Sequence, residues 1–184
     1  MQFSVRKAQE IKKVLLNPEE KVPSKTYYML RGLPFFSKKG RRCDLTIIPA
    51  FNLGKEFNKT FGHIHSKQEE ELYKLLTGKA LFVLQKMKKN SPNHIEEIKL
   101  IHANRGDYIK ITSGWYHETI NIGKSPLVLI NWLPQETKND YSLIEKQQGF
   151  GYYIIKAKSG YQLVKNENYK YVPEPKVIKE PNKN

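Results

Sequence analysis

Residues 62–78 read GHIHSKQEEELYKLLTG, and residues 106–121 read GDYIKITSGWYHETIN. The first stretch contains His63, His65 and Glu71, and the second contains His117. Side chains two positions apart on an extended chain leave the same face, so His63 and His65 can reach one point without distortion. Three neutral imidazoles and one carboxylate suit a first-row transition metal and leave coordination positions for a substrate. The two stretches therefore predict one divalent metal site.

Short segments rich in β-branched and aromatic residues surround both stretches, and turn-forming residues separate nearly all of them. Such turns are predicted at 77–79, 90–93, 104–107 and 123–126. We expect strands at 43–49, 61–65, 71–76, 80–86, 95–101, 108–111, 116–122 and 127–133. Strands at this spacing predict an all-β fold, an antiparallel double-sheet jelly-roll barrel.

The chain before the barrel has a different pattern. Apolar residues recur at helical spacing from Val5 to Leu16, and Asn17-Pro18 follows, so we expect an N-terminal helix there. A lead-in strand is expected at 26–30. We therefore assign residues 1–41 to a lead-in segment of the same single domain.

The chain after Leu133 also changes character. We expect a helical turn at 142–147 and a hairpin that joins 151–158 to 161–165. The proline-containing stretch from 172 to 184 predicts an extended tail. We therefore assign residues 42–150 to the barrel and residues 151–184 to a small C-terminal extension.

Composition restricts the classes of function. The formal net charge is +14, but 27 of the 32 basic residues are lysines and they are spread along the whole chain. We therefore expect no nucleic-acid partner, although a basic surface would attract a small anionic substrate. The single cysteine, Cys43, excludes an intramolecular disulfide and fits a reducing compartment. Because no apolar run approaches about 18 residues, we expect no membrane span and a cytoplasmic protein.

The two stretches that open this section resemble the two cupin motifs. In the first motif Gly78 makes the turn after the glutamate strand, and in the second Gly106, Gly114, His117 and Asn121 keep the motif spacing. Thr112 stands where the family usually has proline, and the gap between His65 and Glu71 is slightly longer than usual. The resemblance implies a cupin double-stranded β-helix with His63, His65, Glu71 and His117 as metal ligands.

A longer resemblance, over roughly residues 46–150, is to the metal-dependent cupin-type phosphoglucose (glucose-6-phosphate) isomerases found mainly in archaea. It rests on residues 53–57, 60, 62–65, 71–73, 115, 117, 119, 121–123, 140–141 and 149–150. The resemblance implies a homodimer with one divalent metal ion per subunit; we expect Fe²⁺ first, with Mn²⁺, Ni²⁺ and Zn²⁺ as alternatives. It also implies that Thr46, Thr60 and Gly62 bind a sugar phosphate, and that Tyr141 lies near the cavity mouth.

The implied reaction interconverts glucose 6-phosphate and fructose 6-phosphate, which moves a proton between C1 and C2 of the open-chain sugar. A bound metal could stabilise the enediolate that develops, and a base must take the proton. Glu71 is the candidate base. Tyr73, two positions later on the same strand face, is a second catalytic candidate, although a core aromatic is an equal interpretation. A hydride shift is the rival chemistry.

Two other classes of function remain open. Gly114, Leu133 and Asn139 stand where archaeal family members carry further polar pocket residues, so the exact sugar preference is not determined. The chain could instead be a non-catalytic sugar-phosphate-binding cupin, which would show stabilisation by ligand without turnover. It could also be another cupin metalloenzyme, such as an oxygenase, which would consume O₂.

Overall fold

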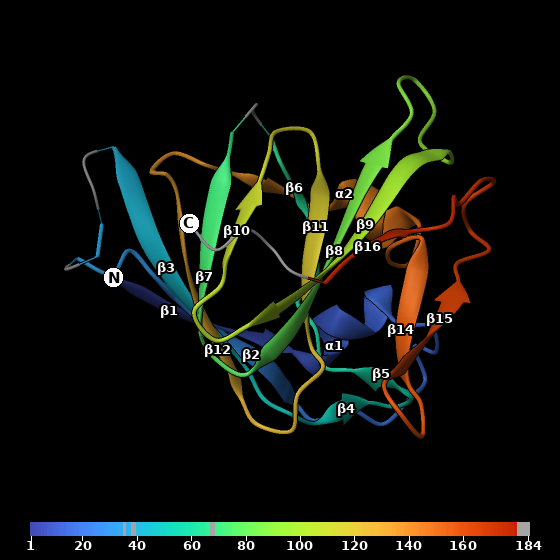
Figure 1. The fold of residues 1–184 in the computed structure, drawn as a ribbon, viewed down its shortest axis with the longest axis horizontal. Coiled ribbons are helices and arrows are strands. Elements are labelled where there is room, and N and C mark those ends of the chain that lie inside the picture. Colours follow the sequence, from blue (N-terminus) through green and yellow to red (C-terminus); the bar gives the residue numbers. More distant parts are fainter. Residues whose placement is uncertain (35, 38–39, 67–68, 180–184) are drawn as a thin grey trace.

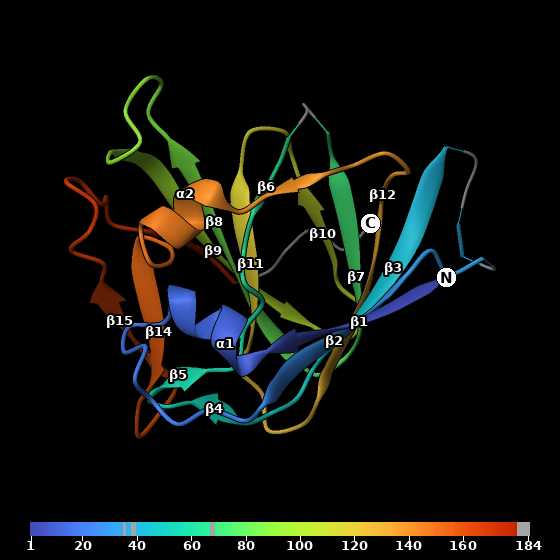
Figure 2. The same cartoon turned by 180° about the vertical axis from the view of Figure 1, so that it is seen from behind.

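The computed structural model describes residues 1–34, 36–37, 40–66 and 69–179. Two main β-sheets lie on opposite sides of the centre of the molecule, and smaller sheets and short helices lie around them (Figures 1 and 2). The main sheets are not joined into one closed sheet. The all-β prediction is therefore confirmed, with a barrel that stays open between its two halves.

One main sheet has six antiparallel strands in the order β1-β2-β3-β12-β7-β10. Its strands are β1 (Gln2–Lys7), β2 (Lys25–Arg31), β3 (Arg41–Ile48), β12 (Leu127–Pro134), β7 (Glu71–Thr77) and β10 (Tyr108–Ile111). In β7 the alternate residues Glu71, Tyr73 and Leu75 are buried and the residues between them are half-buried. This period of two places the glutamate on the inner face of the sheet.

The other main sheet has four strands in the order β11-β8-β9-β16. Its strands are β11 (Tyr116–Asn121), β8 (Lys79–Met87), β9 (Ile95–Asn104) and β16 (Lys176–Ile178). Residues 80–85 of β8 are all buried, because the C-terminal segment packs against this sheet. Gln85 makes that contact, since its Nε2 donates to the Tyr169 hydroxyl at 3.0 Å and its Oε1 accepts from the Gly151 N–H at 2.9 Å. Both faces of the sheet are therefore covered.

Short elements complete the fold. The small strands are β6 (Ile64–His65) paired with β13 (Asn139–Asp140), and β15 (Tyr161–Lys165), β14 (Tyr152–Lys156), β5 (Glu56–Phe57) and β4 (Asn52–Leu53) in one sheet. The helices are α1 (Ala8–Ile11), a 3₁₀ turn (Lys12–Val14) and α2 (Ser142–Lys146). In the described part of the chain, no helix has the length and apolar character needed to cross a membrane.

One continuous hydrophobic core joins the two main sheets. Tyr73 of the six-stranded sheet meets Phe82 of the four-stranded sheet edge-on, with ring centroids 5.3 Å apart. Leu75 and Leu129, each 1% exposed, lie in the same core. Burying one such side chain contributes about 1.5–3 kcal/mol. This packing holds strand β7, and with it Glu71, against strands of the opposite sheet.

The N-terminal helix prediction is wrong in extent. Residues 2–7 form strand β1, which pairs with β2 so that Val5 lies opposite Tyr28, and helical structure is confined to residues 8–14. A helix of the expected length is marginal on its own, whereas the edge of β2 offers hydrogen bonds to an extended chain. Ile11, Val14 and Leu15 are buried as their apolar spacing requires.

Two further predictions need correction. The expected extended tail contains strand β16, whose residues Lys176–Ile178 pair in parallel with Lys99–Ile101 of β9, while residues 180–184 lie outside the described part. The expected strand at 61–65 is shorter: β6 holds Ile64–His65, and His63 makes an isolated bridge to His117. Both differences come from pairing with residues distant in the sequence, which are those of β9 for the tail and His117 for His63. The hairpin of β14 with β15, the helical turn at 142–146 and the lead-in strand β2 are confirmed.

Candidate metal centre

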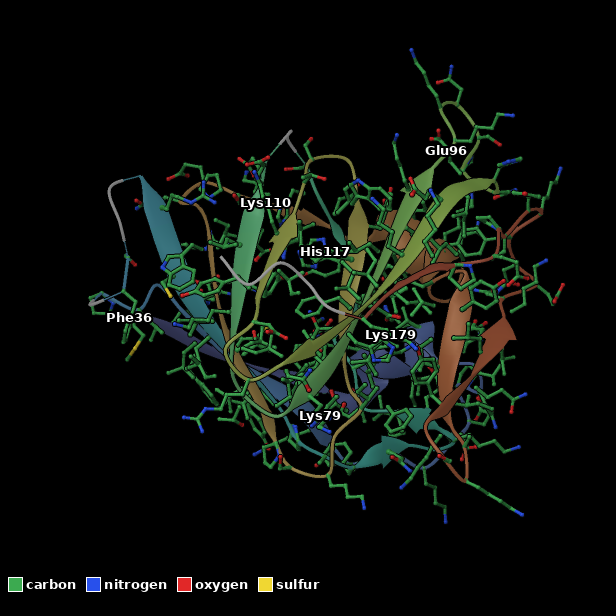
Figure 3. All side chains as sticks on the ribbon, viewed as in Figure 1. Phe36, Lys79, Glu96, Lys110, His117 and Lys179 are labelled. Carbon is green, nitrogen blue, oxygen red and sulfur yellow. The ribbon has the colours of Figure 1, made fainter. Side chains whose placement is uncertain are left out.

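Four predicted ligands come together from three parts of the fold. Glu71 is the first residue of β7 in the six-stranded sheet, and His117 lies on β11 in the four-stranded sheet. Mutual backbone hydrogen bonds, His63 N–H to His117 O at 3.1 Å and His117 N–H to His63 O at 2.9 Å, hold His63 beside β11. His65 follows in β6. Figure 3 shows His117 in the interior between the main sheets, so the site bridges the two halves of the barrel.

The four side chains converge on one point. One potential ligand atom from each of His63, His65, Glu71 and His117 lies within 4.8 Å of the corresponding atom of every other. Nε2 of His65 and Nε2 of His117 lie 3.2 and 3.1 Å from Oε2 of Glu71. These three atoms are buried and none has a hydrogen-bond partner within the described structure. Buried polar atoms are costly without a partner, and a divalent cation would satisfy all of them at once. The donor set therefore fits a metal.

Neighbouring groups orient two of these side chains. Nδ1 of His117 lies 3.3 Å from the Trp115 carbonyl; when Nδ1 carries the proton and donates it, Nε2 is left as a ligand. Asn131 of β12 donates from Nδ2 to Oε1 of Glu71 at 2.5 Å. Because Oε1 is held in this way, Oε2 is the oxygen that faces His65 and His117. Asn131 therefore sets the direction of the carboxylate.

A metal ligand must be a neutral imidazole or an ionised carboxylate, and the electrostatics favour that state at His63 and at Glu71. Burial, assisted by His117, lowers the pKa of His63 well below its usual value. Burial opposes ionisation of Glu71, but His117 and His65 hold the pKa of its carboxyl below the usual range. Burial also opposes protonation of His65, and the contact with Glu71 outweighs it and raises the His65 pKa. At His65 the protein alone therefore favours the protonated imidazole, and a bound metal ion would require the neutral form instead.

A cavity opens beside the four side chains, and all the predicted site residues except His65 line it. Its lining includes Thr46, Thr60, Gly62, His63, Glu71, Tyr73, His117 and Tyr141. Leu133 and Asn139, two of the three departures from the archaeal pattern, also line the cavity, and Gly114 is not among the lining residues. The sequence prediction therefore brought together residues that do share one cavity. Their individual roles remain predictions.

Two tyrosines of the cavity are placed differently. Tyr73 is 7% exposed, and burial followed by the charge of Glu71 raises its pKa well above the usual value. Its phenol therefore stays protonated and can donate a hydrogen bond. The Tyr141 ring packs edge-on against Phe61 with centroids 5.4 Å apart, and its hydroxyl accepts from Asn139 Nδ2 at 3.1 Å. Tyr141 thus forms part of the wall near His63, with ring centroids 5.5 Å apart.

Gly62 has a structural reason to be glycine. Its φ is +79°, and a Cβ built there would lie 2.2 Å from Cε2 of Phe150. A side chain is therefore excluded by both backbone conformation and packing. Among the described residues none accepts a hydrogen bond from the Gly62 N–H. The amide is free to serve a ligand in the cavity.

Sequence reasoning missed four polar residues that line the same cavity. They are Arg31, Arg42, Asp44 and Asn131. All lie on strands of the six-stranded sheet, at positions that alternate with outward residues. A polar residue on the inward face of an otherwise apolar strand, such as Asn131 between Leu129 and Leu133, is the signal that could have found them.

The chain is also similar to proteins of known family. A protein-family model described as glucose-6-phosphate isomerase (GPI) matches residues 5–174. The chain belongs to this glucose-6-phosphate isomerase family. Among the curated relatives, the glucose-6-phosphate isomerases of Pyrococcus furiosus and Pyrococcus abyssi are 30% and 31% identical to it over 126 residues. Each match covers 68% of this chain and 62% of the relative, so the chain spans about three fifths of the length of these family members.

A solved structure supports the fold. Recombinant oxalate oxidase in complex with glycolate superposes with a TM-score of 0.50, over 63% of this chain and 55% of that chain, at 15% identity. At this identity the likeness concerns the fold alone. The cupin double-stranded β-helix expected from the two motifs is therefore confirmed.

Proposed function

We propose that the protein is a metal-dependent aldose–ketose isomerase that interconverts glucose 6-phosphate and fructose 6-phosphate. The observation that carries the proposal is the set of buried, unpartnered Nε2 and Oε2 atoms of His65, His117 and Glu71. They lie beside a cavity that Glu71 and His117 line, in a member of the glucose-6-phosphate isomerase family. A divalent ion held by His63, His65, Glu71 and His117 would act as a Lewis acid toward the sugar oxygens. We expect Fe²⁺ in that position, with Mn²⁺, Ni²⁺ and Zn²⁺ as alternatives.

Thr46, Thr60 and Gly62 are proposed to bind the phosphate group. Oγ1 of Thr60 accepts a hydrogen bond from the Thr119 N–H at 2.9 Å, which leaves its own proton available for donation. The free Gly62 N–H adds a second donor, and Thr46 lines the same cavity. Hydroxyl and amide donors suit a phosphate because its oxygens accept several hydrogen bonds at once. These three contacts would fix the substrate relative to Glu71.

Proton transfer at the sugar is assigned to two other residues that line the cavity, Glu71 and Tyr73. Glu71 is ionised at neutral pH, as a proton acceptor must be, so we propose it as the base. Tyr73 keeps its proton and lies two positions along the same strand face, where it could donate to Glu71 or to a sugar hydroxyl. Tyr141 would close one side of the substrate space. An enediolate or a hydride shift would both use this arrangement.

A coupled isomerase assay tests the proposal. Protein stripped with a chelator should be inactive, and addition of Fe²⁺ or Mn²⁺ should restore conversion of glucose 6-phosphate to fructose 6-phosphate. Glu71→Gln and His117→Ala should abolish turnover. The labelled-hydrogen exchange between C1, C2 and solvent would separate proton transfer from a hydride shift. Absence of turnover across several metals would reject the isomerase.

Subunit assembly belongs to the same proposal. The family resemblance implies a homodimer, and the outer edge of β1 in the six-stranded sheet has no neighbouring strand within the described chain. An edge strand of this kind can pair with a second copy. Light scattering of the purified protein should report a dimer; a monomer at all concentrations would contradict it.

A further inference from the structure

One arginine of the cavity lacks an ionic partner. Arg31 ends strand β2, lines the cavity and is half-buried. Its guanidinium donates only to Sδ of Met29, at 3.8 Å, and among the described residues no carboxylate lies within 4.0 Å of it. A cation in this position has given up part of its hydration without gaining a counter-charge.

The neighbouring arginine is different. Nε of Arg42 donates to Oδ2 of Asp44 at 3.1 Å, and its Nη1 donates to the Gln135 carbonyl at 2.7 Å. The other oxygen of Asp44 accepts from the Gly32 N–H at 2.8 Å. Asp44 is therefore committed on both oxygens to other groups. Arg31 is the arginine of the pair that is left free for a ligand.

Strand register places Arg31 beside the proposed phosphate contacts. Met29 of β2 lies opposite Thr46 of β3, and Leu30 lies opposite Leu45. Arg31 follows Met29 by two residues, so both side chains lie on the same face of β2, the face that lines the cavity. Arg31, Thr46, Gly62 and His63 all line the same cavity. Arg31 therefore shares the cavity with Thr46 and with the metal ligand His63.

We propose that Arg31 contacts the anionic group of the substrate and thereby selects phosphorylated sugars over neutral ones. The inference rests on the proposed isomerase function for its substrate and extends it to a residue that the family resemblance did not assign. The planar fork of donors on a guanidinium matches two phosphate oxygens, while Thr46, Thr60 and Gly62 offer neutral donors. A sugar phosphate would supply the counter-charge that the protein itself does not.

The test compares Arg31→Met with Arg105→Met. Arg105 is exposed in the turn between β9 and β10, so both variants lose one positive charge but only one loses it in the cavity. Inorganic phosphate is titrated calorimetrically into chelator-stripped protein, where it cannot bind through a metal. Glucose 6-phosphate and glucose are titrated into Mn²⁺-loaded protein. Circular dichroism and the melting temperature check that each variant folds.

We expect Arg31→Met to raise the Kd for phosphate and for glucose 6-phosphate by about ten- to a hundred-fold, the usual value of a hydrogen bond to a charged group. Arg105→Met should leave both constants within about two-fold. Arg31→Lys should recover part of the affinity, because it restores the charge without the fork. In turnover, KM for glucose 6-phosphate should rise far more than kcat falls, and the weak binding of glucose should not change.

The outcomes separate this inference from the proposed function. Equal phosphate binding by Arg31→Met and Arg105→Met, with wild-type turnover intact, would overturn the role of Arg31 and leave the isomerase standing. Arg31-dependent phosphate binding without isomerisation would support the anion contact and reject the isomerase. A wild-type protein that binds neither phosphate nor glucose 6-phosphate would overturn both. If Arg31→Met does not fold, Arg31→Lys against the same control decides the result.

Discussion

Two groups of titratable side chains meet at strand β11, which contributes one residue to each, and they differ in how their charges are balanced. The metal cluster consists of His63, His65, Glu71 and His117. The lysine cluster consists of Glu56, Lys59 and Glu118, in which Nζ of Lys59 lies 2.8 Å from Oε2 of Glu56 and 3.8 Å from Oε2 of Glu118. His117 and Glu118 are consecutive in β11 and so point to opposite faces of the sheet. Neighbouring residues of one strand thus enter two unlike environments.

The lysine cluster contains its own cation. Burial would lower the pKa of Lys59, but Glu118 and Glu56 raise it on balance, so the ammonium stays charged. Burial raises the pKa of Glu118 to about 7, with Lys59 acting against it. The Lys59 ammonium also lies 5.5 Å from the centre of the Tyr153 ring. Oε2 of Glu56 and both carboxylate oxygens of Glu118 make no hydrogen bond within the described structure, but Lys59 supplies a positive charge to both carboxyl groups. The protein itself therefore provides the cation of this cluster.

The metal cluster is built from one carboxylate and three imidazoles, without Lys or Arg among its members. Its Nε2 and Oε2 atoms crowd one point, and among the described residues no Lys or Arg forms an ion pair with Glu71. The contrast indicates that burial of charge alone does not mark a functional site. What marks it is a set of donors whose missing partner is a cation and which borders a cavity.

Removal of the metal should give the largest effect. Because the ion would supply several kcal/mol of transition-state stabilisation, His117→Ala should lower kcat/KM by at least about a thousand-fold. Chelation should lower the melting temperature of the wild type but leave that of His117→Ala unchanged, since binding stabilises only a competent site. The coupled isomerase assay measures kcat/KM, and scanning calorimetry with and without chelator measures the melting temperatures.

His102→Ala is the matched control for His117→Ala. His102 lies outside both motifs, and its Nε2 is 2.9 Å from the Tyr161 hydroxyl. The variant should keep full metal content and activity. Loss of metal in His102→Ala as well would show that the assay reports general damage to the fold.

Lys59→Met should give the next largest effect, this time on folding. It leaves Glu56 and Glu118 buried without their cation, which typically costs about 3–5 kcal/mol in the free energy of unfolding. Urea denaturation measures this loss. The double variant Lys59→Met with Glu118→Gln should recover part of it, because one uncompensated charge is removed. If the folded fraction of Lys59→Met bound less metal per subunit than the wild type, the two clusters would not be independent of each other.

Asn131→Leu should have a smaller effect, confined to the metal cluster. Without the hydrogen bond to Oε1, Glu71 loses its orientation, and metal affinity should fall by about ten- to a hundred-fold. Asn121→Leu is the matched control, because Asn121 is equally buried but donates to the Ile48 and Ser125 carbonyls. It should destabilise the fold and leave the metal Kd unchanged. Equal metal affinity in both variants would remove Asn131 from the site.

An exposed ion pair should give the smallest effect. Nζ of Lys110 lies 2.9 Å from Oε2 of Glu70, and both side chains are about half exposed. Lys110→Ala should change the free energy of unfolding by no more than about 1 kcal/mol, because solvent screens the pair. Urea denaturation at low and high salt checks this. A cost as large as that of Lys59→Met would contradict the role given to burial.

Much of the barrel was predictable from local pattern. Alternating apolar residues and turn signals predict strands close to those observed at β3, β7, β8, β9, β10, β11 and β12, because a strand with one face in a core has a period of two. The flanking segments were less predictable. Strands β1 and β16 exist through pairing with β2 and β9, and a pairing partner distant in the sequence leaves no local signal.

The candidate site was likewise predictable from the sequence only in part. Its ligand types were readable from the motifs at 62–78 and 106–121, since imidazole and carboxylate at fixed spacing on strands restrict what the chain can bind. Only the tertiary structure decided which partners these groups have. Asn131 donates a hydrogen bond to Glu71, and Asp44 pairs with Arg42 and not with Arg31. Lys59 lies beside Glu118, on the face of β11 opposite to His117. Each of these contacts depends on which strands become neighbours and in which register. Sequence determines the chemical groups a strand can offer, and the packing of the sheets determines which of them meet.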